Sequence, residues 1–84
     1  MGRSARRRVE AHAEGMVAEE LKRRRWDEGE LGRRAKGDPQ KVAIAVRLRA
    51  ETAVTVKWIA ERLDMGAPGY ANHLLYRQRK LEGQ

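Results

Sequence analysis

The sequence predicts an all-α fold, a small bundle of four to five helices, from three observations. First, the 84 residues include no Phe and only two Trp and two Tyr, so the core must be built from Leu, Val, Ile, Met and Ala. That set suits packed helices better than a sheet sandwich. Second, apolar residues recur at intervals of three and four. Third, Asp27, Asp38 and Thr55 precede apolar segments at the spacing of helix N-caps.

The chain begins with eight residues that hold four arginines and almost nothing apolar. Such a segment cannot offset its ordering entropy by burial, so residues 1–8 are expected to form a flexible basic arm. Residues 9–84 then form a single helical domain, because a chain of this length builds only one thin core and buries roughly 60–65% of its unfolded surface.

A first helix is predicted from Val9 to Trp26. Its apolar positions share one face: Val9, Ala13, Met16, Val17 and Leu21. The acidic residues of this segment are expected on the solvated face, namely Glu10, Glu14, Glu19 and Glu20.

Two further helix starts follow in the middle of the chain. Asp27 and Glu30 have the spacing of a capping box, which predicts a short helix with Leu31 and Ala35 inward and Gly37 as its left-handed stop. Asp38 and Pro39 then begin a third helix that runs to about Ala50. Its apolar positions cover a wide arc, so we expect it to be central: Val42, Ile44, Ala45, Val46 and Leu48.

Residues 55–80 have the spacing of a helix-turn-helix. Thr55 caps a helix whose buried residues are Ile59, Ala60 and Leu63. The chain then breaks at Met65–Gly66 and restarts at Ala67–Pro68. The last helix follows with its own inward-facing positions: Ala71, Leu74, Leu75 and Gln78. A large apolar residue followed by a small one, a glycine turn and apolar anchors is the order that this motif requires.

Charge narrows the classes of partner. The chain has 19 Lys and Arg against 12 Asp and Glu, a net charge of +7, and the surplus lies toward its two ends. Polyanions, and DNA above all, are the natural partners of such a chain. No apolar run approaches the about 20 residues of a membrane span, so no membrane role is expected. The absence of Cys excludes a disulfide framework and fits a cytoplasmic location.

The stretches Ala50–Gly66 and Tyr70–Leu75 resemble the C-terminal segment of REP-associated tyrosine transposases, relatives of the IS200-type single-strand transposases. Val17–Lys22 and Gly37–Ala45 are similar to the spacer that precedes it in that family. The resemblance begins at about residue 10 and is sharpest from Arg47 to Leu75. Members of the family usually carry an aromatic residue near the start of the last helix, where this chain has Ala67, Pro68 and Gly69.

The catalytic part of such a transposase has no counterpart here. Cleavage there needs a Tyr nucleophile and a metal held by a His-hydrophobic-His pair. His12 and His73 are 61 residues apart and have no local metal-ligand spacing. The chain is therefore expected to be a non-catalytic accessory domain that contacts DNA, with no cofactor and no metal.

Roles in DNA contact follow from side-chain chemistry. The base-edge candidates, whose amide, imidazole or guanidinium can pair with bases, are Asn72, His73 and Arg77. The phosphate candidates are Arg6, Arg7, Arg8, Lys57, Arg79 and Lys80. Tyr70 and Tyr76 can stack on an unpaired base, whereas Trp58 is expected in the core.

Two other functions stay open. A basic helical bundle can serve as a protein interaction or dimerisation module, with its charge providing solubility. A small transcriptional regulator would share the DNA chemistry but needs a two-fold dimer with recognition helices about 34 Å apart. The sequence contains no dimerisation heptads, so it does not set the oligomeric state, nor does it distinguish duplex from hairpin or single-stranded DNA.

Overall fold

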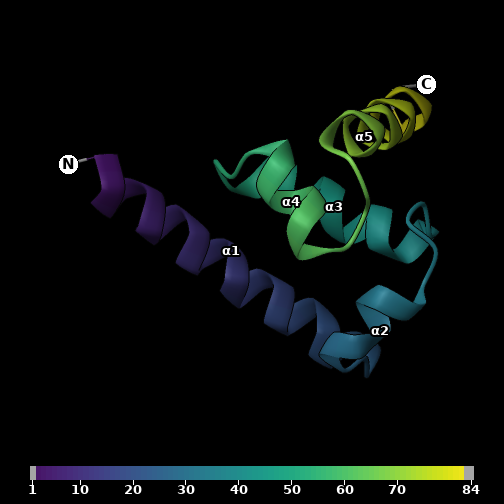
Figure 1. Cartoon of the computed structure of the whole chain (residues 1–84), viewed down its shortest axis with the longest axis horizontal. Coiled ribbons are helices and arrows are strands. Elements are labelled where there is room, and N and C mark those ends of the chain that lie inside the picture. Colours follow the sequence, from purple (N-terminus) through teal and green to yellow (C-terminus); the bar gives the residue numbers. More distant parts are fainter. Residues whose placement is uncertain (1, 83–84) are drawn as a thin grey trace.

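The computed structural model describes residues 2–82 of the chain, and the side chains of residues 6–81. This part of the chain is all-α, as predicted, and contains no strand. Its elements are α1 (Gly2–Arg24), α2 (Glu28–Arg33), α3 (Pro39–Glu51), α4 (Val56–Arg62) and α5 (Pro68–Glu82) (Figure 1).

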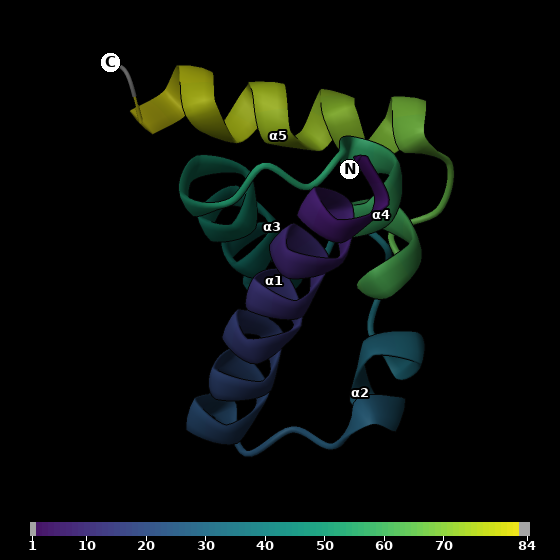
Figure 2. The ribbon, with the colours of Figure 1, turned by 90° about the vertical axis from the view of Figure 1, so that its left-hand side faces the viewer.

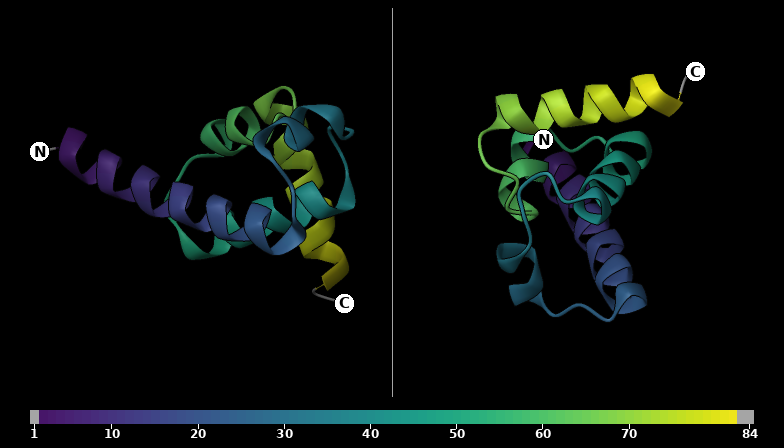
Figure 3. Two further views of the ribbon diagram at one scale, coloured as in Figure 1. Left: turned by 90° about the horizontal axis from the view of Figure 1, so that it is seen from below. Right: turned by 90° about the vertical axis from the view of Figure 1, so that its right-hand side faces the viewer.

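Helix α3 is the centre of the bundle. It packs against α1, α4 and α5, and its residues Ile44, Ala45 and Leu48 are almost completely buried. Figure 2 shows α5 lying across α3 and α4, while α2 lies at the other end of the molecule. The two views of Figure 3 agree that α1 is the long helix along which the others are arranged. The predicted central position of the third helix is therefore confirmed.

The core contains the residue types that the composition predicted. Among the residues described, the buried hydrophobic side chains belong to Ala, Val, Ile, Leu and Met only. They include the expected face of α1 and the stripe of α4, and both Trp26 and Trp58 pack against this core while remaining partly exposed. Core packing of Trp58, which we expected in preference to base stacking, is thus confirmed.

Three predicted caps are present. The Asp27 carboxylate accepts from the Glu30 amide at 2.9 Å, and the Thr55 hydroxyl oxygen accepts from the Trp58 amide at 3.0 Å. Asp38 accepts from the amides of Gln40 and Lys41 at 3.0 and 3.1 Å. These bonds satisfy amides that the first helical turn leaves without partners.

Helix α1 starts earlier than expected. The sequence predicted its start at Val9 after a flexible arm, but the helix already begins at Gly2. Arg and Ala are good helix formers, so a helix held by the core farther along extends through residues 2–8 at little cost. Arg6, Arg7 and Arg8 are exposed on this extension.

Helix α2 is shorter than expected. It ends at Arg33, Ala35 is exposed, and Gly37 is not the left-handed stop. Arg34 leaves the helix with an extended backbone, places its guanidinium 4.0 Å from the centre of the Trp26 ring, and bonds to Glu30 at 2.9 Å. The Trp26 ring is eight residues away, so no local helix pattern encodes that contact, whereas the bond to Glu30 has the i, i+4 spacing of a helix.

Gly37 has a different role. A β-carbon at this position would lie 3.0 Å from the Tyr70 hydroxyl and 3.6 Å from a methyl of Leu74. The glycine therefore allows α5 to approach the α2–α3 connection closely.

Two helices end at left-handed residues other than glycine. Arg25 has φ 60° and Asp64 has φ 53°, and the following amides, of Trp26 and Met65, bond back to the carbonyls of Leu21 and Ala60 at 2.9 Å. This is the bond pattern of a Schellman cap. The predicted turn at Gly66 is also present, with φ 81°, so the connection from α4 to α5 contains two left-handed residues.

Candidate nucleic-acid interface

The ion pairs among the described side chains involve α1, α2, α3, Arg62 of α4 and the residues that flank α2, and several of them tie these elements together. Arg62 of α4 bonds to Glu14 of α1 and holds both carboxylate oxygens of Glu28 of α2, at 2.9 and 2.8 Å. Arg47 of α3 reaches Glu20 of α1 at 2.5 Å. The cations in these pairs are already neutralised by acidic neighbours.

Glu20 is the acidic centre of this network, contrary to the expectation that it lies on a solvated face. Its residue is only 2% exposed, and its carboxylate accepts from Arg23, Arg24 and Arg47. Burial by itself raises the pKa of Glu20, but the hydrogen bonds from Arg47 and Arg24 and the nearby positive charges outweigh it, so the pKa lies below its ordinary value. Glu14 is also half-buried and paired.

Helix α5 has the opposite charge pattern. Residues 68–81 contain no acidic residue, and the described side chains of α5 form no ion pair. Ala71 and Leu75 are buried against the bundle and Leu74 is partly buried. The other face is exposed and carries the predicted site residues of this helix: Tyr70, Asn72, His73, Tyr76, Arg77, Arg79 and Lys80. The predicted inward and outward positions of the last helix therefore agree with the structure.

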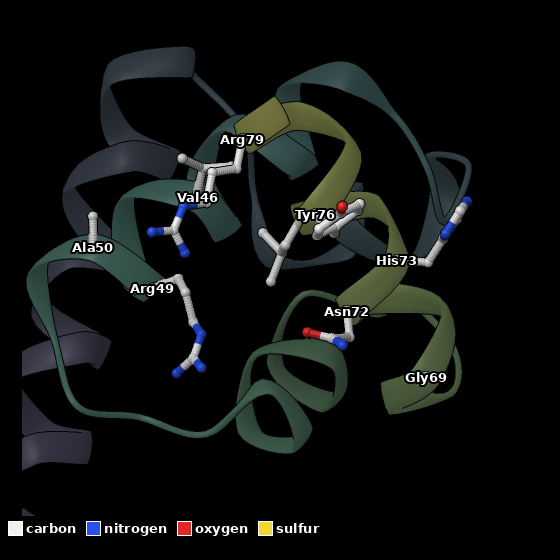
Figure 4. A pocket seen from close by; sticks show the side chains of 9 residues that line it. Val46, Arg49, Ala50, Gly69, Asn72, His73, Tyr76 and Arg79 are labelled. Atoms are coloured by element: carbon white, nitrogen blue, oxygen red, sulfur yellow. The ribbon is translucent and has the colours of Figure 1, made fainter. Parts of the chain in front are cut away.

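A groove of about 710 Å³ runs between α3 and α5 (Figure 4). Four of the predicted residues line it, Asn72, His73, Tyr76 and Arg79, together with Arg49 of α3. Val46, Ala50 and Leu75 give it an apolar floor, and no carboxylate is among its lining side chains. Figure 4 shows His73 turned to the other side of α5 from Arg49 and Asn72.

Arg49 is the residue that sequence reasoning missed. It is exposed near the C-terminal end of α3 and pairs with none of the described acidic side chains, whereas Arg47 two residues earlier is bonded to Glu20 and Glu51. The sequence does show that Arg47 and Arg49 fall on different faces of a helix. It does not show which of them faces α5.

The remaining predicted residues lie elsewhere. Tyr70 is exposed on α5 but stands beside Gly37, outside the groove. Lys57 is exposed on the first turn of α4. Arg6, Arg7 and Arg8 lie near the start of α1, which Figure 1 places at the opposite end of the molecule from α5. The phosphate candidates therefore lie on three helices, α1, α4 and α5, rather than in one patch.

His12 and His73 are exposed on different helices, and the described residues contain no group of three or more acidic or histidine side chains placed to hold a metal ion. In the same part of the chain, no helix combines the length and the apolar character that crossing a membrane would need. Comparisons of the chain with protein-family models, with curated proteins and with solved structures find no match.

Proposed function

We propose that this chain is a non-catalytic DNA-binding domain in which α4, the turn at residues 63–67 and α5 act as a helix-turn-helix. In this proposal the exposed face of α5 contacts DNA, in keeping with the resemblance of Ala50–Gly66 and Tyr70–Leu75 to the C-terminal segment of REP-associated tyrosine transposases. Asn72 and Arg77 would contact base edges, and Arg79 and Lys80 would contact phosphates.

One observation carries the proposal: the cations of α5 have no acidic partner among the described side chains, whereas Arg23, Arg24, Arg33, Arg47 and Arg62 of the other helices are paired. Arg77, Arg79 and Lys80 are all exposed on a helix that has no acidic residue from 68 to 81. An unpaired cation can replace the counterions of a phosphate without first breaking an ion pair. The start of α5 supports the proposed DNA contact less, since Pro68 and Gly69 offer DNA little beyond their backbone.

Fluorescence anisotropy on labelled duplex, hairpin and single-stranded DNA across a salt series tests the proposal. Each neutralised phosphate should add about −0.9 to the log-log slope on duplex and about −0.7 on single strands. We expect binding at low salt that weakens steeply as salt is added. No measurable binding to any of the three at low salt would overturn the proposal.

A protein interaction module is the second candidate, favoured by one specific observation. The exposed large hydrophobic side chains of the described residues, Tyr70, Tyr76 and Leu81, all belong to α5. If this face binds protein, Tyr76→Ser with Leu81→Ser should abolish self-association in sedimentation velocity. If it binds DNA, the wild-type chain should sediment identically at low and high concentration in the absence of DNA.

A further inference from the structure

The groove between α3 and α5 suits a ligand that is both flat and negatively charged. The guanidinium groups of Arg49 and Arg79 enter from two different helices, and neither has an acidic partner among the described side chains. The floor made by Val46 and Leu75 is apolar. The volume of the groove, about 710 Å³, lies within the roughly 300–1,000 Å³ typical of small-molecule sites.

The polar groups at the rim narrow the chemistry further. Tyr76 lines the groove and is 63% exposed, so its ring is available for stacking. The Asn72 amide, which Figure 4 shows projecting from α5 on the same side as Arg49, can donate and accept in the plane of a base. Ring, amide and two cations together match the base and the phosphate of one nucleotide.

A paired base does not fit this arrangement. In a duplex each base face is covered by its neighbours in the stack, so protein side chains meet only base edges and phosphates. A groove with an apolar floor and an exposed ring needs an open base face, which only an unpaired nucleotide offers. An acidic peptide would satisfy both arginines but would leave the Tyr76 ring without a flat partner.

We infer that the α3–α5 groove is a subsite for one unpaired nucleotide of the bound DNA. Its base stacks on Tyr76 beside the Asn72 amide, and its phosphate is held by Arg49 and Arg79. The inference rests on the proposed DNA binding and specifies the DNA as one with a local single-stranded element, such as a bulge. It also assigns a role to α3, outside the helix-turn-helix.

The test compares a 20-bp duplex with the same duplex carrying one bulged 2-aminopurine. Because stacking of a base on an aromatic ring strengthens binding by about five- to 140-fold, wild-type protein should prefer the bulged DNA by that factor. It should also quench the 2-aminopurine fluorescence. Tyr76→Leu should remove both effects, whereas Tyr70→Leu, on the same helix but outside the groove, should keep them.

A second matched pair separates the groove from the rest of α5. Arg49→Gln should reduce the preference for the bulge, while Arg77→Gln, exposed but not in the groove, should weaken binding to both DNAs equally. All four side chains are exposed, and thermal melts followed by circular dichroism verify that the variants fold.

Different outcomes would overturn the subsite and the proposed DNA binding. Equal binding of the plain and bulged duplexes, or a preference unchanged by Tyr76→Leu, would overturn the subsite and leave DNA binding intact. Absence of binding to either DNA would overturn both proposals. Displacement of the bulged DNA, but not of the plain duplex, by poly-glutamate at equal charge concentration would assign the groove to acidic protein segments and overturn the subsite.

Discussion

Lys41 shows how one residue can join parts of the chain that are far apart in sequence. It is fully buried, and its Nζ donates to the carbonyls of Leu31 and Asp64 at 2.7 Å and of Arg34 at 3.3 Å. Burial lowers the pKa of Lys41, against the opposing charges of Asp64 and Asp38. The three N–H bonds of the ammonium are thus matched by three carbonyls from the ends of α2 and α4.

Replacing Lys41 by Met should lower the free energy of unfolding by about 1–3 kcal/mol. The apolar side chain has a similar shape, but three buried carbonyls lose their donor. Removal of a buried charge offsets part of that cost. Urea denaturation measures the change, with the exposed Lys57→Met as the control, which should stay within about 0.5 kcal/mol of wild type. Equal stability of the two variants would show that these bonds contribute little.

The lowered pKa of Glu20 predicts that the stability of the fold depends on pH. The pKa of Glu20 in the folded chain lies below the ordinary value of 4.5. A depressed carboxylate stabilises the fold above its unfolded pKa, and this contribution is lost as the pH falls from about 4.5 through the folded pKa. Glu20→Gln should therefore unfold more easily at neutral pH but lose less stability than wild type on acidification.

Denaturant midpoints measured at about pH 7, 5 and 3 provide the check. The neighbouring Glu19→Gln is the matched control, because Glu19 is exposed and forms no ion pair with the described side chains. If both variants follow the wild-type pH profile, the arginine cluster does not stabilise the ionised form of Glu20.

The helix caps could be predicted from the sequence, whereas the burial of Lys41 and Glu20 could not. The caps at Asp27, Asp38 and Thr55 depend on a spacing of two or three residues, so the sequence alone identifies them. Lys41 and Glu20 are charged residues that a helical pattern assigns to the surface. Their burial depends on which carbonyls and arginines the tertiary fold brings near, and no local spacing encodes that.

At the scale of the element, the connection from α4 to α5 sets the direction of the helix proposed to meet DNA. The sequence identified its glycine, but not the left-handed stop at Asp64 two residues earlier. Asp and Asn tolerate this conformation better than most residues with a β-carbon, which makes such a stop hard to recognise. Gly37 is mistaken for a helix stop for a related reason: a glycine that allows close packing with α5 looks the same in the sequence as one that ends a helix.

Gly66→Ala should destabilise the chain by about 1–2 kcal/mol. Gly66 has φ 81°, where an L-residue is strained, and the new β-carbon would lie 3.0 Å from Cδ of Lys36. Gly15→Ala should instead stabilise by about 0.5–1 kcal/mol, because Gly15 is exposed in the middle of α1 with nothing within 4 Å of a β-carbon. Thermal melts of the two variants should therefore shift in opposite directions, and a shift in the same direction would contradict this assignment of the turn.

In the folded molecule, the unpaired positive charges are distributed unevenly over the surface. The sequence shows basic residues toward both ends, and counting charges goes no further. The structure adds that Arg47 and Arg62 form ion pairs between helices, whereas the cations of α5 and Arg6, Arg7 and Arg8 of α1 pair with none of the described acidic side chains. These two unpaired groups lie at opposite ends of a molecule whose longest extent is 37 Å (Figure 1).

This separation predicts that the two groups contribute differently to short and long DNA. One turn of duplex measures about 34 Å, so a 20-bp duplex can reach both groups while an 8-bp duplex can reach only one. Neutralising Arg6, Arg7 and Arg8 together should therefore reduce the magnitude of the log-log salt slope by up to about 2.7 on 20 bp and leave it unchanged on 8 bp. Neutralising Arg77, Arg79 and Lys80 should reduce the slope on both lengths, because α5 carries the face that we propose contacts the DNA.

Anisotropy titrations at several salt concentrations give all four slopes. Equal flattening on the two lengths by the first triple variant would contradict this prediction, because it would place the start of α1 and α5 within one short footprint.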